Sequence, residues 1–436
     1  MQTQFTVAAL ADPDTAEAEK VLRKCVHCGF CTATCPTYVL LGDELDSPRG
    51  RIYLIKEMLE HSRPATAAVV QHLDRCLSCL ACMTTCPSGV HYQHLIDHAR
   101  AHVERTYRRP LGERLLRAGL AQILPFPGRL RFALRLAGLV PGPVRRSKLL
   151  PAALRAMLAL AAAPTAAPRA PVAAPARPRT ARGRIALIVG CAQGVLTPET
   201  HAASVRVLAR AGWEVVPVSG CCGALTHHLG RGAEADGFAA RLLAQLRAKS
   251  AAGEFAAVVV NAAGCGTQLK DYGYLYRNHP RLAPDAARFG ALARDVTEVL
   301  ALAPLPVQPS PGRPVVAYHS ACSLQHGQQL DALPRRLLRE AGFEVREVAE
   351  GHLCCGSAGS YNILQPRLAA ELRDRKRANI ERTGAAVVAA GNVGCIMQLR
   401  GAGSMPVVHT VELLDWACGG PRPALLQGAS SAAGNG

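Results

Sequence analysis

The sequence has few aromatic side chains and no apolar run long enough to cross a membrane. Phe, Trp and Tyr make up 4% of the 436 residues, whereas apolar residues make up 49%. A core must therefore be built from Ala, Leu and Val. A spanning helix needs roughly 20 consecutive apolar residues, and Arg or Pro interrupts every candidate between Leu111 and Ala163. We expect no transmembrane helix.

Nucleotide-binding and export signals are also missing. No G-x-G-x-x-G follows a predicted strand, and no P-loop motif occurs, so we expect no flavin, nicotinamide or nucleotide site in this chain. The first 20 residues contain four acidic residues before the first Lys and no apolar segment, so we expect no secretory signal. A cytoplasmic location follows, in which the 17 cysteines serve metal ligation rather than disulfide formation.

The net charge of +18 is concentrated in one segment. Residues 105–183 contain 16 Lys and Arg but one acidic residue, Glu113. Nucleic-acid binding would call for aromatic residues or a known module beside this charge, and neither is present. An anionic membrane surface or an acidic partner fits the segment better, so we expect a peripheral position on the inner face of the membrane. The alternative is an arginine-rich composition on solvated helix faces.

Two stretches, residues 25–36 and 76–87, share the spacing C-x2-C-x2-C-x3-C-P. Bacterial ferredoxins use this spacing: three cysteines hold one 4Fe–4S cluster, and the fourth ligates the other cluster. Zinc sites usually lack the third cysteine at the same step. We therefore predict two 4Fe–4S clusters. Their ligands are Cys25, Cys28, Cys31 and Cys86 for the first cluster, and Cys76, Cys79, Cys82 and Cys35 for the second.

The segment between and around these motifs has helical periodicity. Ser47 and Pro48 are a candidate N-cap and first residue of a helix over 48–62. Further helices are predicted over 15–24, 65–75 and 90–107. The two-cluster domain should therefore be of the helical kind.

The C-terminal half contains an internal repeat of about 130 residues. Apolar strands alternate with helices in each copy, which indicates βαβ units and parallel sheets. We expect two pseudo-twofold α/β lobes that face one another. The predicted strands cover 185–189, 213–218 and 257–261 in the first copy, and 315–319, 344–348 and 386–390 in the second.

Each repeat places four cysteines in turns after its strands, where open α/β sheets hold their ligands. These are Cys191, Cys221, Cys222 and Cys265 in the first, and Cys322, Cys354, Cys355 and Cys395 in the second. Four thiolates suffice for a metal centre, and the Gly after each Cys-Cys pair permits a tight turn. Further iron–sulfur clusters, zinc and an empty thiol pocket all remain open.

Paired ferredoxin motifs followed by two Cys-Cys-Gly repeats resemble the glycolate oxidase iron–sulfur subunit family. Residues 25–31 and 45–51 (Leu-Asp-Ser-Pro-Arg-Gly-Arg) carry the resemblance in detail. It implies a complex with an FAD-binding catalytic subunit and a second flavoprotein-like subunit. That complex oxidises glycolate to glyoxylate and passes electrons toward a quinone.

The C-terminal half is also similar to the Cys-Cys-Gly domains of heterodisulfide reductase, whose repeats use five cysteines. The fifth position is Gln268 in one repeat and Gln398 in the other. This difference argues against noncubane clusters and disulfide reduction.

The expected fold class is α+β and multidomain, with a helical two-cluster ferredoxin domain before two pseudo-symmetric α/β lobes. The expected segments are 1–108 for the ferredoxin domain, 109–183 for basic helices and an Ala/Pro/Arg linker, 184–305 and 306–420 for the lobes, and 421–436 for a disordered tail. The expected function is a non-catalytic electron-transfer subunit of a glycolate dehydrogenase. The alternatives are the same role with lactate or glycerol 3-phosphate, a heterodisulfide-reductase-like catalytic subunit, and a zinc-organised scaffold.

Overall fold

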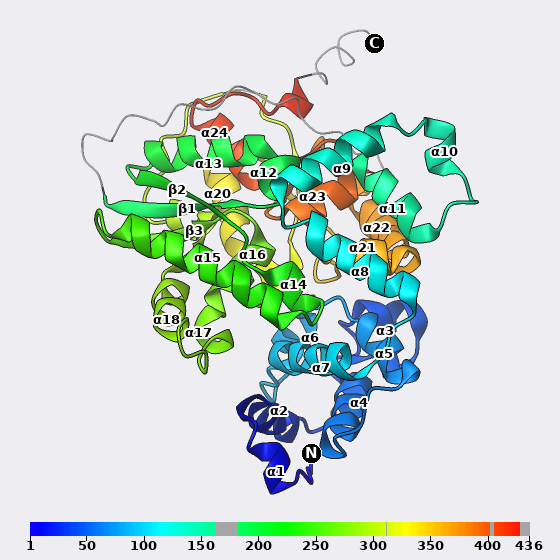
Figure 1. The fold of residues 1–436 in the computed structure, drawn as a ribbon. Coiled ribbons are helices and arrows are strands. Elements are labelled where there is room, and N and C mark those ends of the chain that lie inside the picture. The colour runs from blue at the N-terminus through cyan, green and yellow to red at the C-terminus, as the bar shows by residue number, and fades with distance from the viewer. Residues whose placement is uncertain (163–181, 311, 402–404, 428–436) are drawn as a thin grey trace.

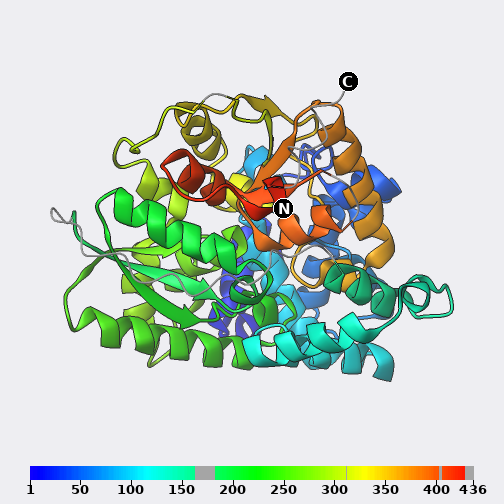
Figure 2. The same ribbon diagram turned by 90° about the horizontal axis from the view of Figure 1, so that it is seen from above.

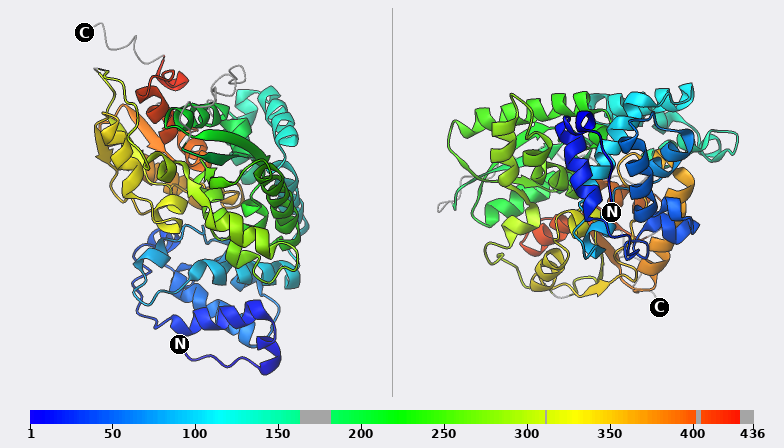
Figure 3. Two further views of the ribbon diagram at one scale, coloured as in Figure 1. Left: turned by 90° about the vertical axis from the view of Figure 1, so that its left-hand side faces the viewer. Right: turned by 90° about the horizontal axis from the view of Figure 1, so that it is seen from below.

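The computed structural model describes residues 1–162, 182–310, 312–401 and 405–427. A helical N-terminal domain lies at one end of the molecule, beneath two α/β lobes (Figures 1 and 3). This arrangement confirms the predicted α+β class with two similar lobes.

The N-terminal domain is entirely helical in its regular elements. Its core is formed by Leu22, Ile55, Leu73, Leu95 and Ile96, which are all buried. The elements are α1 (Val7–Leu10), α2 (Pro13–Lys24), α3 (Pro36–Leu41), η1 (Glu44–Asp46), α4 (Pro48–Glu60), α5 (Ala67–Asp74), α6 (Ala81–Thr85) and α7 (Tyr92–Thr106).

Helix α4 begins as the sequence predicts. The Ser47 hydroxyl accepts a hydrogen bond from the Gly50 amide at 3.0 Å, and Pro48 is the first helical residue. A side-chain cap satisfies one of the amides that the first turn of a helix leaves unpaired. The cap fixes where the chain turns after the first cysteine motif.

Four helices lead from this domain along the outside of the lobes (Figure 2). They are α8 (Leu111–Ile123), α9 (Pro127–Leu139), α10 (Gly142–Arg146) and α11 (Ala152–Ala161). Helix α9 contacts the first lobe and α11 the second. The predicted Ala/Pro/Arg linker falls largely on residues 163–181, outside the described residues. None of the described helices is long and apolar enough to span a membrane.

The first lobe is a four-stranded parallel sheet with helices on both faces, in the strand order β2-β1-β3-β4. Its elements are β1 (Arg184–Gly190), α12 (Gln193–Leu196), α13 (Pro198–Arg210), β2 (Glu214–Gly220), α14 (Ala224–His228), α15 (Gly232–Ser250), β3 (Phe255–Val260), α16 (Ala263–Lys270), α17 (Tyr272–Leu275), α18 (Ala283–Ala291), β4 (Ala293–Asp295) and α19 (Val296–Leu300).

The second lobe repeats this topology in the order β6-β5-β7-β8, again all parallel. Its elements are β5 (Val316–His319), η2 (Ser323–Gly327, a π-helix), α20 (Ala332–Glu340), β6 (Val345–Glu347), α21 (Tyr361–Leu364), α22 (Pro366–Glu381), β7 (Val387–Ala390), α23 (Val393–Arg400), β8 (Val407–His409), α24 (Thr410–Ala417) and η3 (Ala424–Leu426).

The six strands predicted from the repeat are all present, and each sheet has one additional edge strand, β4 or β8. Each additional strand is followed at once by a helix with a capping box, Asp295 with Glu298 and His409 with Glu412. The two lobes therefore match beyond the segments that contain cysteine.

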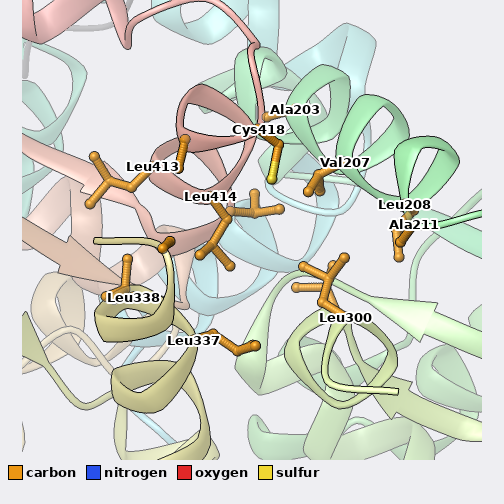
Figure 4. Packing of buried hydrophobic residues seen from close by; sticks show 14 of the residues in the cluster. Ala203, Val207, Leu208, Ala211, Leu300, Leu337, Leu338, Leu413, Leu414 and Cys418 are labelled. Carbon is orange, nitrogen blue, oxygen red and sulfur yellow. The ribbon is translucent and has the colours of Figure 1, made fainter. Parts of the chain in front are cut away.

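The lobes share one apolar core. Leu208 of α13 and Leu300 of α19 meet Leu338 of α20 and Leu414 of α24 (Figure 4). Strand β1 shows why the sheet can serve two cores: Ile185 and Leu187 face the shared cluster, whereas Ala186 and Ile188 face α15. A strand alternates its side chains between faces, so continuous apolar strands fit a sheet covered on both sides.

The C-terminal end differs from expectation. Residues 424–426 form a short 3-10 helix, and Leu426 is buried in the shared core. The predicted disordered tail therefore does not begin at residue 421, because this apolar side chain anchors the chain. Residues 428–436 lie outside the described part.

Histidine–aspartate pairs join the N-terminal domain to the first lobe. His94 of α7 lies 3.0 Å from Asp271, and Asp97 lies 3.2 Å from Nδ1 of His228 and 3.4 Å from Nε2 of His227. Burial opposes the charge on Asp97, but His228 and His227 outweigh it and hold the pKa of Asp97 well below its usual value. Helix α7 is thus fixed beside the Cys-Cys-Gly turn of the first lobe.

Candidate metal centres

The N-terminal domain contains a first hollow beside the first cysteine motif. Cys25, Cys28 and Cys31 line it together with Cys86 from the second motif, and Cys82 reaches its wall. The chain thus brings together the four residues predicted for the first cluster. Four thiols around one hollow suit the donor set of a 4Fe–4S cluster.

A second hollow is lined by the other predicted set. Cys76, Cys79 and Cys82 line it together with Cys35 from the first motif. Cys82 lies on the walls of both hollows, so the two spaces are immediate neighbours. The fourth cysteine of each motif lines the hollow of the other motif, where the proline-terminated spacing predicts it.

The two motifs share an unusual backbone. His27 and Gly29 have φ of 56° and 84°, and the matching Ser78 and Leu80 have 48° and 63°. Residues with positive φ in a tight turn can aim successive amides toward one side, a geometry that favours anions. The Ser78 amide donates to the Cys76 sulfur at 3.5 Å. Both loops can therefore stabilise negative charge inside their hollows.

A buried charge network supports the second hollow. Arg51 donates to Asp46 at 3.2 Å, to the Thr37 hydroxyl at 3.0 Å and to the His72 carbonyl at 2.7 Å, and its Nη1 lies 3.8 Å from the Cys35 sulfur. Asp46 also pairs with Arg75 at 2.7 Å.

Burial opposes the charge on Arg51, but nearby Cys76, Tyr92, Cys35 and Asp46 outweigh it and hold its pKa above the usual value. Sequence reasoning missed the roles of Arg51 and Asp46. The signal lay in residues 45–51, which carried the family resemblance without a physical explanation.

Burial also affects the predicted ligands themselves. It raises the pKa of the Cys79 and Cys82 thiols well above the usual value, and neighbouring thiols add to this effect. Without a metal these groups stay protonated, so cluster assembly must displace their protons.

The Cys-Cys-Gly turns have the same geometry in both lobes. Gly223 and Gly356 have φ of 78° and 84°, and a Cβ atom would lie 3.0 Å from the Ala235 oxygen in the first and 2.4 Å from the Ala369 oxygen in the second. Only glycine fits both the dihedral angle and the space. In each turn the glycine amide donates to the first sulfur of the pair at 3.4 Å.

These turns bring the predicted thiols together. In the first lobe the Cys191 and Cys221 sulfurs are 3.5 Å apart, and Cys222 contacts Cys265. In the second lobe Cys322 contacts Cys354, and Cys355 contacts Cys395. All four cysteines of the second lobe are buried, whereas Cys191 and Cys265 of the first are partly exposed.

Sequence reasoning missed one residue of the second lobe, His319. It ends strand β5, and a ring nitrogen lies with the Cys355 and Cys395 sulfurs in a group whose atoms are all within 4.8 Å of one another. An alignment of the two repeats could have pointed to this residue. The spacing between Cys191 and Cys322 aligns His319 with Ile188, so the second repeat has a histidine where the first has an apolar residue.

The glutamines at the fifth cysteine position do not join the thiols by hydrogen bonds in the described structure. Gln398 accepts from Asn362 at 3.0 Å and donates to the Ala369 carbonyl at 3.2 Å. These two hydrogen bonds hold α23 against α21 and α22, so the Gln398 side chain has a structural role.

The second hollow adjoins the second lobe. Cys79 and Leu77 pack in one cluster with Cys322 and Cys354. At the opposite end Cys28 is exposed, beside the exposed side chains of Val26 and Phe30. The thiol groups thus form a series from the surface, through both hollows, to the second lobe.

Known protein families match both halves of the chain. Residues 24–90 match the 4Fe-4S dicluster domain, and residues 185–270 and 316–400 match the cysteine-rich domain named CCG. These family matches confirm the prediction that the chain is an iron–sulfur protein. The assignment of individual cysteines to each cluster stays a prediction.

Three relatives illustrate the range of similarity. The chain is 43% identical to the glycolate oxidase iron-sulfur subunit of Escherichia coli strain K12, over 96% of this chain and 99% of that protein. It is 32% identical to a probable glycolate oxidase iron-sulfur subunit of Bacillus subtilis strain 168, over 92% and 95%. Lactate utilization protein A of an Exiguobacterium strain is 26% identical over 53% of this chain and 96% of that protein. With full-length similarity at this level, the chain belongs to the glycolate oxidase iron–sulfur subunit family.

Proposed function

We propose that this protein is the iron–sulfur electron-transfer subunit of a glycolate oxidase complex. An FAD-binding partner subunit oxidises glycolate to glyoxylate, with loss of two electrons and two protons, and this chain carries the electrons one at a time toward a quinone-type acceptor. A second flavoprotein-like subunit completes the complex. The observation that carries the proposal is the pair of adjoining hollows, each lined by four cysteines of the predicted set.

The ligand assignment is part of the proposal. Residues 1–108 would hold both clusters, each of which accepts and releases one electron when bound. Cys25, Cys28, Cys31 and Cys86 hold the first, and Cys76, Cys79, Cys82 and Cys35 hold the second. The chain's own contribution is to hold these thiolates, to exclude water around Cys82, and to place positive charge near Cys35 through Arg51.

The alternatives differ in substrate or in role. A lactate or glycerol 3-phosphate complex would use the same series of thiols, because substrate chemistry resides in the partner; similarity along the whole chain favours glycolate over lactate. A heterodisulfide-reductase-like catalytic role is disfavoured by Gln268 and Gln398, which occupy the fifth cysteine positions.

Metal analysis of the full chain purified without oxygen tests the relay. The protein should be brown and contain about eight irons from the N-terminal motifs, and its reduced clusters should show magnetically coupled EPR signals. Alone it should not oxidise glycolate, and activity should return when the partner subunits are added. Colourless protein with stoichiometric zinc, or glycolate oxidation by this chain alone, would contradict the proposal.

A peripheral membrane position is a second part of the proposal. Helices α8–α11 expose large apolar side chains next to arginines, a combination that suits an interface with anionic lipid. The exposed apolar residues are Leu111, Leu115, Phe132, Leu136, Leu139, Val144 and Leu154 on the helices, and Leu149 in the segment between α10 and α11. Since charge attraction is screened beyond about 10 Å at 0.1 M salt and apolar burial is not, a high-salt wash should release only part of the protein.

Replacing Leu139 and Leu149 with Ser should make that wash complete, as measured by flotation with vesicles containing anionic lipid. Replacing Leu302, an exposed leucine outside these helices, is the matched control. Equal retention of all three proteins would contradict lipid contact by α8–α11.

A further inference from the structure

We propose that His319 is a metal ligand of the second lobe, where one imidazole nitrogen and the Cys355 and Cys395 thiolates bind a borderline-soft transition metal. The ion is either Zn²⁺ or an iron of an iron–sulfur cluster, since both accept mixed imidazole and thiolate ligands. This inference stands independently of the proposed electron relay, because it concerns metal binding alone.

The first argument is geometry. One nitrogen of His319 and the two sulfurs lie within 4.8 Å of one another. Zinc bound by sulfur at roughly 2.3 Å and nitrogen at roughly 2.0 Å keeps tetrahedral ligand atoms about 3.5 Å apart. A modest contraction would therefore close the site around an ion. All three residues are at most 5% exposed, which suits a structural metal or a protected cluster.

The second argument is an unsatisfied nitrogen. His319 is 1% exposed, and its Nε2 has no hydrogen-bond partner within the described residues. Buried polar atoms are paired in the great majority of cases. The ring of His319 thus offers a nitrogen to the two thiols and has a nitrogen without a hydrogen bond, a combination that metal binding accounts for.

The third argument is charge. Lys376 of α22 is 2% exposed; burial lowers its pKa, and Cys322, Cys355 and Cys354 partly offset this effect. Its ammonium donates to the Glu350 carbonyl at 2.6 Å. A buried cation beside several cysteines offsets the negative charge that thiolates acquire when they bind a metal.

The first lobe provides an internal comparison. The 131-residue spacing between Cys191 and Cys322 aligns Ile188 with His319. Gly223 abuts Ala235, and Gly356 abuts Ala369. The two alanines are 134 residues apart, and this offset aligns Leu242 with Lys376. The first lobe thus has two buried apolar side chains where the second has a ligand and a cation. The two Cys-Cys-Gly sites should therefore differ in what they bind.

A rival group is explained without a metal. Asp43, Asp46 and His72 also offer atoms within 4.8 Å of one another. There, however, Arg51 and Arg75 already neutralise Asp46. Among the described residues, these are the two groups of three His, Cys, Asp or Glu side chains whose potential ligand atoms all lie within 4.8 Å of one another.

X-ray absorption on the full chain purified without oxygen tests the proposal. If zinc is present, its spectrum should show sulfur neighbours together with imidazole scattering. If iron occupies the site, pulsed EPR of the reduced protein should show coupling to a histidine nitrogen that changes on ¹⁵N-histidine labelling. These wild-type spectra need no variant. A wild-type protein with no imidazole signal on either metal would overturn the assignment.

Variants add a quantitative measure. His319→Gln should lose the imidazole signal and release the metal of the second lobe to a chelator at least about tenfold more readily, since even outer-shell changes weaken binding by 10- to 100-fold. His61→Gln, at the exposed C-terminal end of α4, should behave like the wild type. Unchanged spectra and metal retention in His319→Gln would likewise refute the role of His319.

Discussion

Cys79→Ser is expected to reduce electron transfer through the assembled complex by at least about 100-fold. Changes to residues around the ligands already reduce metal affinity or activity by up to about 100-fold, and this substitution removes a proposed ligand. Cys79 lines the second hollow and packs against Cys322 and Cys354 of the second lobe. It therefore lies where the series of thiol groups passes from the N-terminal domain to that lobe. A buried serine hydroxyl is a much poorer ligand for iron than a thiolate, because it gives up its proton far less readily, so the second cluster should be lost.

The measurement is glycolate-dependent reduction of a dye or quinone by the complex, with iron content and bound flavin determined on the same sample. Iron should fall by about four per chain, while flavin in the partner stays constant. Cys418→Ser is the matched control, because Cys418 is buried in the shared core of the lobes, away from both hollows. Full activity in Cys79→Ser would show that electrons bypass the second hollow.

The elements that the sequence predicted are those in which local chemistry and fold agree. Ser47 caps α4 because its hydroxyl and the following proline act within one turn. The predicted strands other than β6 were recognisable alone because they are apolar and mostly rich in β-branched residues. Strand β6 has three residues, two of them charged, and was found through its place in the repeat. The cysteine hollows were predictable since the C-x2-C-x2-C-x3-C-P spacing encodes the exchange of the fourth ligand.

The features that escaped prediction depend on contacts between distant segments. Strands β4 and β8 have three residues each, and their pairing with β3 and β7 gives them their identity. Arg51 reads as an ordinary helical arginine until Asp46, Thr37 and His72 surround it. Likewise, nothing near His319 in sequence shows that Cys355 and Cys395 will lie beside it. Hydrophobic periodicity in a sequence indicates which face of a helix or strand is buried, but it does not identify the residues that pack against that face.

Arg51→Met should destabilise the protein by about 3–5 kcal/mol, the usual cost of removing one partner of a buried ion pair. Arg51 is 1% exposed and Asp46 is fully buried, so the carboxylate would keep only Arg75 and His72 as partners. The Thr37 hydroxyl and the His72 carbonyl would each lose a donor as well. Urea unfolding followed by circular dichroism measures the change.

The same substitution should lower the reduction potential of the second cluster. Reduction adds negative charge, and the Arg51 guanidinium, 3.8 Å from the Cys35 sulfur, stabilises that charge. Potentiometry followed by EPR should therefore show a shift to more negative potential in Arg51→Met, and a smaller shift in Arg51→Lys, which keeps the charge.

Arg336→Met is the control, since its pair with Glu340 is exposed on both sides and such pairs contribute at most about 1 kcal/mol. If Arg51→Met unfolded at the same urea concentration as Arg336→Met and kept the wild-type potential, the buried network would have neither role. A loss of stability with an unchanged potential would instead restrict Arg51 to holding η1, α4 and α5 together around the second hollow.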